Sequence, residues 1–302
     1  MLFRSLKAST QRDYNYLYKA IFADWHKKPL TEITKAMVSK RHQELGQARG
    51  EAQSNIAMRF LRSVINFAIA RFDDHKGQSI ITENPVRVLS TTRAWFRPER
   101  RRTIIKPYQL KEWYRAVITL KECDKESSPH MNNELVADYL LLMLFTGLRR
   151  TETAKLRWSD IDFQYRTITI SDTKNHETHT LPLTDFLFDL LRTRKVSAVN
   201  DYVFSGKEGI GHLVEPKRQI LKVIEQSGVQ FTLHDLRRTF ATVAESLDIS
   251  PYTVKRLLNH KMRNDVTAGY IITDIERLRE PMQKVTDYLF EACNAKPMAT
   301  VI

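Results

Sequence analysis

The chain has 302 residues, enough for two domains that each bury a core, and its 42% hydrophobic and 27% charged residues are typical of water-soluble globular proteins. Its longest apolar run, residues 140–145, is far shorter than the roughly 20 residues of a membrane span, and its first residues lack the features of a secretory signal. Cys123 and Cys293 fit no metal-ligand spacing, so we expect free thiols in a reducing compartment, the cytoplasm.

The positive charge of the chain is concentrated near its N-terminus. The net charge is +13, and residues 1–100 carry 18 Lys and Arg against 9 Asp and Glu. Such a region is typical of proteins that bind a polyanion, most often nucleic acid. Charge alone does not decide this, because many basic surfaces bind nothing. We expect no membrane partner, since no segment joins a basic face to an exposed apolar face.

The first hundred residues are predicted to be helical. Over residues 9–25 apolar side chains recur with the spacing of one helical face, and Ser9 or Thr10 is a suitable N-cap. That face consists of Tyr14, Leu17, Tyr18, Ile21 and Phe22. A second, weaker helix is expected to begin near Thr34.

A third predicted helix, near residues 56–71, combines an apolar face with basic residues beside it. The apolar face consists of Ile56, Phe60, Val64, Phe67 and Ala68, and core packing is enough to explain it. Arg59 and Arg62 lie off this face and are candidate DNA-binding residues. Asn84-Pro85 then disfavours further helix.

Residues 93–106 are predicted to be a basic linker. Five arginines and a proline within residues 93–102 suit an extended segment that lies against phosphates, although a solvated charge run is the alternative. The candidate DNA contacts are Arg97, Arg100, Arg101 and Arg102. The chain would then consist of a helical DNA-binding domain at 1–92, this linker, and a second domain at 107–302.

The second domain is predicted to be mainly helical with one β-hairpin. Pro107 suits the first turn of a helix, and residues 134–145 are apolar nearly all round, which indicates a central buried helix that ends near Gly147. Alternation over residues 166–170 and 178–182 predicts two strands joined by a polar turn. Further helices are expected from Thr184, Pro216, Thr232, Ser250 and about Asp274. The expected fold class is therefore mainly α with a small β-sheet (α+β).

Two segments of this domain present basic side chains where regular structure breaks. In Thr-Gly-Leu-Arg-Arg-Thr-Glu (146–152), Arg149 starts a helix, where its guanidinium and backbone N–H groups can bind a phosphate together. Glu152 is close enough to orient a neighbour. Lys174 lies at the predicted hairpin tip and can act as a mobile acid. Each signal is weak alone, because Gly-Leu-Arg is frequent by chance and a hairpin lysine is usually solvated.

Two later segments supply histidines, a second arginine and a tyrosine. In Leu-His-Asp-Leu-Arg-Arg-Thr-Phe-Ala (233–241), His234 and Arg237 are three residues apart, so one helical face can present both to the same anion. His260 follows an apolar helix, and Tyr270 comes ten residues later. Considered singly, a surface salt-bridging pair and a core tyrosine are the simpler explanations.

Taken in this order, the four segments resemble the active-site set of the tyrosine recombinases, the phage integrase family. Thr-Gly-Leu-Arg-x-x-Glu, His-x-Leu-Arg-x-Thr-Phe-Ala and Leu-x-His followed by Tyr match in residue type, order and approximate spacing. The resemblance covers roughly residues 5–290, because the basic helical region looks like the family's core-binding domain. The chain departs from the family at Asn259, where glycine is usual, and in a His260–Tyr270 interval one residue longer than usual. The family's arm-binding domain would precede residue 1, and we expect it to be absent or removed.

The resemblance implies that the Tyr270 hydroxyl attacks a phosphodiester and forms a 3′-phosphotyrosine, leaving a free 5′-hydroxyl. Arg149 and Arg237 would neutralise the non-bridging oxygens, and Lys174 would protonate the leaving oxygen. Storage of the bond energy in the phosphotyrosine allows rejoining without a nucleotide cofactor, and no metal is expected.

The remaining side chains of the set are implied to have supporting roles. His234 would assist proton transfer with Tyr270, and His260 would donate a hydrogen bond to a phosphate oxygen. Glu152 would orient the side of the site that contains Arg149 and His234.

The predicted function is site-specific recombination that integrates or excises a mobile element. Its partners would be double-stranded DNA attachment sites, a homotetramer of the chain, and DNA-bending or directionality factors, in the cytoplasm and associated with the nucleoid. The last helix, with Leu278, Met282, Val285 and Leu289 on one face, can pack against a neighbouring protomer or on its own domain. A type IB topoisomerase and a catalytically silent DNA-binding regulator are the alternative functions.

Overall fold

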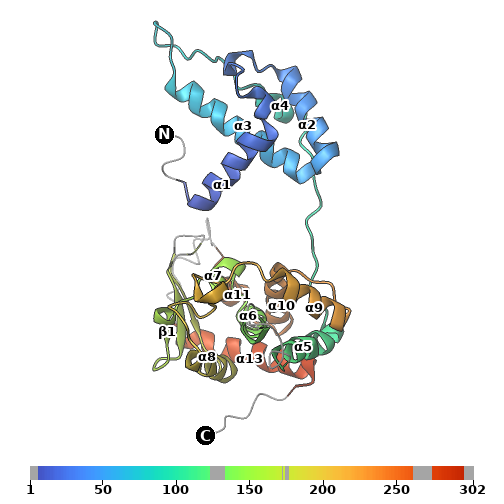
Figure 1. Ribbon diagram of the computed structural model, residues 1–302, viewed down its shortest axis with the longest axis vertical. Helices are drawn as coiled ribbons and strands as arrows, with labels where there is room; N and C mark the ends of the chain where they lie inside the picture. Colours follow the sequence, from blue (N-terminus) through green and yellow to red (C-terminus); the bar gives the residue numbers. More distant parts are fainter. Residues whose placement is uncertain (1–5, 123–132, 172, 174–176, 261–273, 296–302) are drawn as a thin grey trace. The chain divides into compact units, whose positions relative to one another are not determined.

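The computed structural model divides into two compact units, Met1–Arg101 and Arg102–Ile302, each with its own hydrophobic core (Figure 1). The residues that the structure describes are 6–122, 133–171, 173, 177–260 and 274–295. Among these residues, no helix has both the length and the apolar character needed to cross a bilayer.

The first unit is helical, as predicted, and its two longest helices pack against each other. These are α2 (Lys35–Arg49) and α3 (Glu51–Arg71), and Thr34 caps α2 by accepting a hydrogen bond from the Met37 backbone N–H. The other elements are α1 (Ala8–Tyr16), a π-helical turn (Leu17–Ile21), 3₁₀ turns (Ala23–Trp25, Leu30–Glu32 and Pro85–Arg87) and α4 (Val88–Thr91).

Three details predicted for this unit are wrong. The first helix begins at Ala8 after Lys7, and neither serine nor threonine caps it. Tyr18 is exposed, because the chain becomes π-helical there and the angular spacing of side chains changes. Ile56 is also exposed, because α3 turns a neighbouring stripe toward the core of the unit. That stripe consists of Ala57, Met58, Leu61, Ile65 and Ala68.

The predicted linker is held at both of its ends. Phe96 stacks on His42 with ring centroids 4.4 Å apart, and its carbonyl accepts a hydrogen bond from Asn55 Nδ2 at 2.9 Å. Ile105 is buried in the core of the second unit. Residues 97–102, between these anchors, are exposed.

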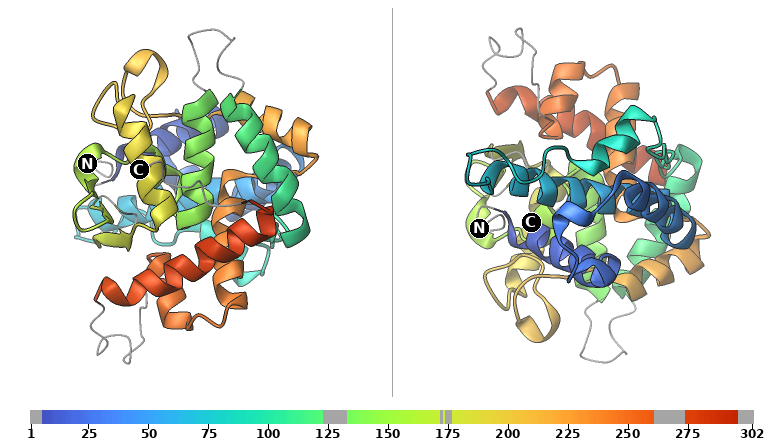
Figure 2. Two further views of the ribbon diagram at one scale, coloured as in Figure 1. Left: turned by 90° about the horizontal axis from the view of Figure 1, so that it is seen from below. Right: turned by 90° about the horizontal axis from the view of Figure 1, so that it is seen from above.

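The second unit is built around α6 (Asn133–Thr146), almost every residue of which is buried. Helices α5 (Pro107–Glu122), α8 (Asp185–Val196), α10 (Leu233–Ser246) and α13 (Glu276–Cys293) surround it (Figures 1 and 2). The shorter helices are α7 (Arg150–Ala154), α9 (Lys217–Ser227) and α11 (Pro251–Leu257). Short 3₁₀ turns cover Trp158–Asp160 and Lys207–Gly209.

The helix starts predicted for this unit are confirmed. Thr184, Pro216, Thr232 and Ser250 are the N-cap residues of α8, α9, α10 and α11. Thr232 and Asp235 form a capping box at the start of α10, in which the Asp235 carboxylate accepts from the Thr232 backbone N–H at 2.8 Å. These caps fix where each helix begins, and therefore where its side chains point.

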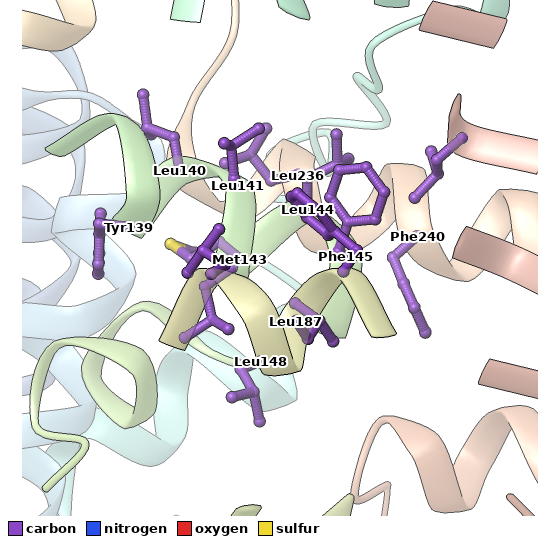
Figure 3. Packing of buried hydrophobic residues seen from close by; sticks show 14 of the residues in the cluster. Tyr139, Leu140, Leu141, Met143, Leu144, Phe145, Leu148, Leu187, Leu236 and Phe240 are labelled. Atoms are coloured by element: carbon purple, nitrogen blue, oxygen red, sulfur yellow. The ribbon is translucent and has the colours of Figure 1, made fainter. Parts of the chain in front are cut away.

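The core around α6 fixes the position of the break that follows this helix. Leu144 and Phe145 of α6 lie near Leu187 of α8 and Leu236 and Phe240 of α10 (Figure 3). Because α6 is covered on every side, its C-terminal end lies inside the unit rather than at the surface. The helix therefore ends at Thr146-Gly147 in a position surrounded by packed helices.

The predicted hairpin is present within a three-stranded antiparallel sheet of order β1-β2-β3. The strands are β1 (Ile161–Asp162), β2 (Thr167–Ile170) and β3 (His179–Pro182), and Ile170 pairs with His179. β1 was not predicted, because two residues are too few to show alternation. The predicted fold class, mainly α with a small sheet, is confirmed.

The last helix, α13, packs on its own unit. Its apolar face contributes to the core that contains α6 and contacts α5, α10 and β3. That face consists of Leu278, Met282, Val285 and Leu289, the residues expected from the sequence. These four side chains are therefore buried within their own domain, and packing of this helix against a neighbouring protomer stays a prediction.

Candidate active site

Arg149 lies at the break between α6 and α7. Gly147 has a φ of +64°, and a Cβ at this position would lie 2.6 Å from Phe240 Cδ1, so both the backbone and the available space require glycine. Arg149 is the N-cap residue of α7, and buried Glu152 accepts hydrogen bonds from its backbone N–H at 3.0 Å and its Nη1 at 2.7 Å. Glu152 therefore holds both the backbone and the guanidinium of Arg149.

Arg237 projects from α10 into the same region. Its side chain is buried, and it donates from Nη1 to the Gly147 carbonyl at 2.6 Å and from Nη2 to the Leu258 carbonyl at 2.5 Å. Burial, followed by the positive charge of Arg149, lowers the pKa of Arg237 to about 10. The guanidinium therefore remains charged at neutral pH, and an anion beside it would be stabilised.

The end of α11 brings the two arginines together. Arg149 Nη2 donates to the Asn259 carbonyl at 3.1 Å, one residue beyond the carbonyl that Arg237 holds. The helix ends in a Schellman motif, in which the His260 N–H donates to the Lys255 carbonyl at 2.8 Å and the Asn259 N–H donates to the Arg256 carbonyl at 3.0 Å. Two guanidiniums far apart in the sequence thus meet at one helix end.

Asn259 has the backbone conformation that a Schellman motif requires. Its φ is +47°, in the left-handed region where glycine is most favourable and asparagine is the next most common residue. The departure from the family pattern noted in the sequence thus preserves the turn. Asparagine in place of glycine keeps His260 directly after the helix.

His234 and His260 lie within electrostatic range of both guanidiniums. Burial is the largest cause of the lowered pKa of each histidine. For His234 the charges of Arg238 and Arg237 come next, and for His260 those of Arg237 and Arg149. Both rings are therefore biased toward the neutral form, in which one ring nitrogen donates and the other accepts.

His179, which the sequence analysis did not select, belongs to the same cluster. It is the first residue of β3 and is buried, and its Nε2 lies 3.1 Å from the Arg256 carbonyl in the last turn of α11. Burial is the main cause that lowers its pKa to about 4. The negative charge of Glu152 raises this pKa, whereas the positive charges of the two active-site arginines lower it further. A signal for it was present, because strand alternation puts His179 on the same face as Leu181, the inward face.

Two predicted site residues cannot be placed in this cluster. Lys174 and Tyr270 lie outside the described residues, as does the whole interval between His260 and Tyr270. Among the residues that are described, no three His, Cys, Asp or Glu side chains are arranged to share a metal ion.

Residues 110–276 match the phage integrase family, and this span is more than half of the chain. The chain belongs to that family. The resemblance found in the sequence is therefore confirmed, and every residue proposed for the site, from Arg149 to Tyr270, lies within the matched span.

Two curated relatives illustrate the similarity. The chain is 30% identical to the prophage integrase IntF of Escherichia coli over 187 residues, which are 60% of this chain and 38% of that protein. It is 32% identical to the tyrosine recombinase XerA of Saccharolobus solfataricus over 135 residues, 44% of each protein. The matched span is thus less than half the length of either relative.

Solved structures with the same fold include two integrases bound to DNA. Lambda integrase (residues 75–356), a dimer bound to a COC′ core site, superposes with a TM-score of 0.66 and 21% identity over 90% of this chain and 94% of that one. The Tn1549 transposon integrase in complex with transposon right-end DNA has a TM-score of 0.67 and 15% identity, over 94% and 96%. These similarities establish that both units have the fold of integrases.

The arginines predicted to contact DNA are all exposed. Arg59 and Arg62, on α3, lie over the ring of Trp95 at 5.9 and 5.8 Å from its centroid. The linker arginines lie in the exposed stretch 97–102. In this member of the phage integrase family, these side chains are therefore free to face solvent or a ligand.

Proposed function

We propose that this chain is a site-specific recombinase that cleaves and rejoins double-stranded DNA through a 3′-phosphotyrosine at Tyr270. The observation that carries the proposal is the convergence of Arg149 and Arg237 on the end of α11, beside His234 and His260. This cluster lies in a chain of the phage integrase family, whose relatives are named integrases and tyrosine recombinases.

The two guanidiniums suit a phosphodiester better than any neutral substrate. Each guanidinium has five N–H donors in a planar fork. Glu152 and backbone carbonyls take some of these donors and fix the orientation of the rest. The remaining N–H groups are available to the two non-bridging oxygens, and charge-assisted bonds of this kind stabilise the transition state of phosphoryl transfer.

The proposed reaction is a transesterification that consumes no water. The Tyr270 hydroxyl oxygen attacks phosphorus while the bond from phosphorus to the 5′-oxygen breaks. His234 accepts the phenolic proton, and Lys174 gives a proton to the leaving 5′-oxygen. Rejoining is the reverse reaction, in which a 5′-hydroxyl attacks the phosphotyrosine. His260 donates a hydrogen bond to a phosphate oxygen throughout.

The proposed exchange of DNA strands indicates which molecules the chain acts with. Recombination joins two duplexes at four strands, so we propose that four copies of the chain act together on paired attachment sites. The exposed arginines of α3 and of residues 97–102 would contact phosphates and make binding salt-dependent. DNA-bending or directionality factors would complete the assembly, and the DNA would be the ends of a mobile element.

The experiment that tests the proposal is covalent trapping. Duplexes that span the ends of the encoding element, nicked near each candidate junction so that the short cleaved strand diffuses away, are incubated with the full chain and run on a denaturing gel. Wild type is expected to give a protein–DNA adduct with no added metal or nucleotide. Tyr270→Phe should bind the same duplexes within about twofold and give no adduct, because the nucleophilic oxygen is missing.

Tyr108→Phe is the matched control, since it removes a hydroxyl from an exposed tyrosine of the same unit and should leave the adduct unchanged. An adduct that persists in Tyr270→Phe would exclude Tyr270 as the nucleophile. Relaxed circles without exchanged flanking sequence would indicate a topoisomerase, and no adduct from wild type would indicate a DNA-binding regulator.

A further inference from the structure

Three side chains from three different elements bind the carbonyl groups at the end of α11. His179 Nε2 lies 3.1 Å from the Arg256 carbonyl, Arg237 Nη2 donates to the Leu258 carbonyl, and Arg149 Nη2 donates to the Asn259 carbonyl. The last turn of a helix leaves such carbonyls without an N–H partner four residues on, and the Arg256 carbonyl also accepts from the Asn259 backbone N–H of the Schellman motif. His260 comes immediately after this turn, so the three contacts also determine where His260 starts.

The chemistry of the contact fixes the proton on the His179 ring. A backbone carbonyl only accepts, so Nε2 carries the hydrogen and Nδ1 has the lone pair. The side chain is 5% exposed, and Nδ1 is buried without a hydrogen-bond partner among the described residues. With its pKa near 4, the ring stays neutral at physiological pH and adds no third positive charge beside the two guanidiniums.

A bound phosphate would affect the hydrogen bond from His179 to α11 differently from the bonds of the two arginines. A phosphate oxygen is a stronger acceptor for a guanidinium than a backbone carbonyl is, because both partners are then charged. A phosphate bound to the remaining N–H groups would share each guanidinium with the end of α11, so the bonds from Arg149 and Arg237 to its carbonyls would weaken. The bond from His179 faces no such competition, because its ring is neutral, buried and anchored on a paired strand.

We propose that His179 is a positioning residue that keeps the end of α11, and with it His260, in place while the two arginines bind the scissile phosphate. This inference rests on the proposed function, since it assigns His179 a part in the same reaction. His179 does not touch the reacting atoms and acts through the Arg256 carbonyl.

The test compares two polar replacements that differ in reach. His179→Gln places an amide N–H near the position of Nε2 and keeps the donor. His179→Asn is one methylene shorter and loses it. His212→Leu is the control, because the His212 ring also lies near a backbone carbonyl, Leu213 at 2.9 Å, but away from the site.

The first readout, which needs no DNA, is amide hydrogen exchange of the full chain over residues 255–260 in saturating inorganic phosphate, which engages the two arginines. We expect exchange in His179→Asn to be at least tenfold faster than in wild type, and exchange in His179→Gln and His212→Leu to stay within threefold. Equal exchange in the Asn and Gln variants would overturn the positioning role. This readout decides the inference even if wild type forms no adduct, a result that would count against the proposed function alone.

The second readout is the rate of adduct formation on the trapping duplex. We expect His179→Asn to be at least tenfold slower with duplex binding within twofold of wild type, and His179→Gln to recover to within threefold. Combining His179→Asn with His260→Ala should slow the reaction little beyond His260→Ala alone, because both changes act through His260. Additive losses would mean that His179 does not act through His260.

A substrate with a better 5′ leaving group separates this role from the general acid. Such a substrate should largely restore Lys174→Ala, which lacks the proton donor, and should not restore His179→Asn. Restoration of His179→Asn would mean that the histidine acts through the hairpin rather than through α11, and would overturn the proposal.

Discussion

The protein holds the two arginines that are proposed to bind one phosphate in different ways. Arg149 is paired with the buried carboxylate of Glu152, whereas the partners of buried Arg237 among the described residues are backbone carbonyls. One positive charge is therefore compensated inside the protein and the other is only partly compensated. The pair therefore keeps net positive charge, which attracts an anion such as a phosphate.

The largest effect is expected at the less compensated arginine. Arg237→Gln should slow adduct formation by about 10²–10³-fold, because a charged donor to the transition state is lost. Its free energy of unfolding should stay the same or rise, because a buried charge is removed as well. Trapping kinetics and denaturant unfolding measure the two quantities. A variant that unfolds several kcal/mol more easily yet still forms the adduct would make Arg237 a structural residue and remove the asymmetry.

Arg149→Gln should differ from Arg237→Gln in its effect on stability. Adduct formation should fall, and the free energy of unfolding should also fall by about 2–3 kcal/mol, because the buried Glu152 carboxylate loses its charged partner. Adding Glu152→Gln should restore most of the stability but not the adduct. Unfolding of Arg149→Gln at the wild-type denaturant midpoint would contradict the proposed compensation by Glu152.

His179, which is neutral and within electrostatic range of both arginines, sharpens the comparison through the pH dependence of stability. The pKa of His179 in the folded state, about 4, lies below its unfolded value of 6.5, so the unfolded chain takes up the proton first. The contribution of His179 is complete above pH 6.5 and is lost as pH falls toward 4, by up to about 3 kcal/mol.

The pH dependence of unfolding, measured as the difference between wild type and His179→Gln, isolates this contribution. The difference is needed because the lowered pKa values of His234 and His260 act in the same direction. Parallel pH curves for the two proteins would show that burial does not lower the pKa of His179 in the folded state.

The smallest effect is expected at the turn that presents its carbonyls to both arginines. Asn259 has a φ of +47°, so Asn259→Ala should lower the free energy of unfolding by about 1 kcal/mol, whereas Asn259→Gly should leave it unchanged or slightly raise it. Thermal unfolding of the three proteins checks the order. An alanine variant as stable as the glycine variant would show that this turn does not depend on the left-handed conformation.

Most of the elements that carry the site could be predicted from the sequence because their signals are local. The apolar run before Gly147 indicated α6, and Thr232 and Ser250 marked the starts of α10 and α11. Errors occurred where local signals compete with packing. Ile56 fits a helical stripe but is exposed, because α3 buries the neighbouring stripe against the rest of its unit.

His179 shows why part of the site could not be predicted. Its neighbours in the sequence indicate only a strand, and the residue that gives it a role, Arg256, lies on a helix much further along the chain. Nothing in a single sequence states that β3 passes the end of α11. The left-handed turn at Asn259 could not be predicted either, since asparagine tolerates that conformation but does not enforce it.

The sequence by itself determined the identities and order of the reactive side chains, the helices and strands that carry most of them, and the family to which the chain belongs. Only the tertiary structure decided that Arg149 and Arg237 share one helix end, that Glu152 compensates one of them, and that a buried histidine completes the set. The physical reason is that caps, breaks and periodicity depend on residues a few positions apart. Burial, charge compensation and the sharing of carbonyl groups depend on elements that meet only when the core around α6 forms.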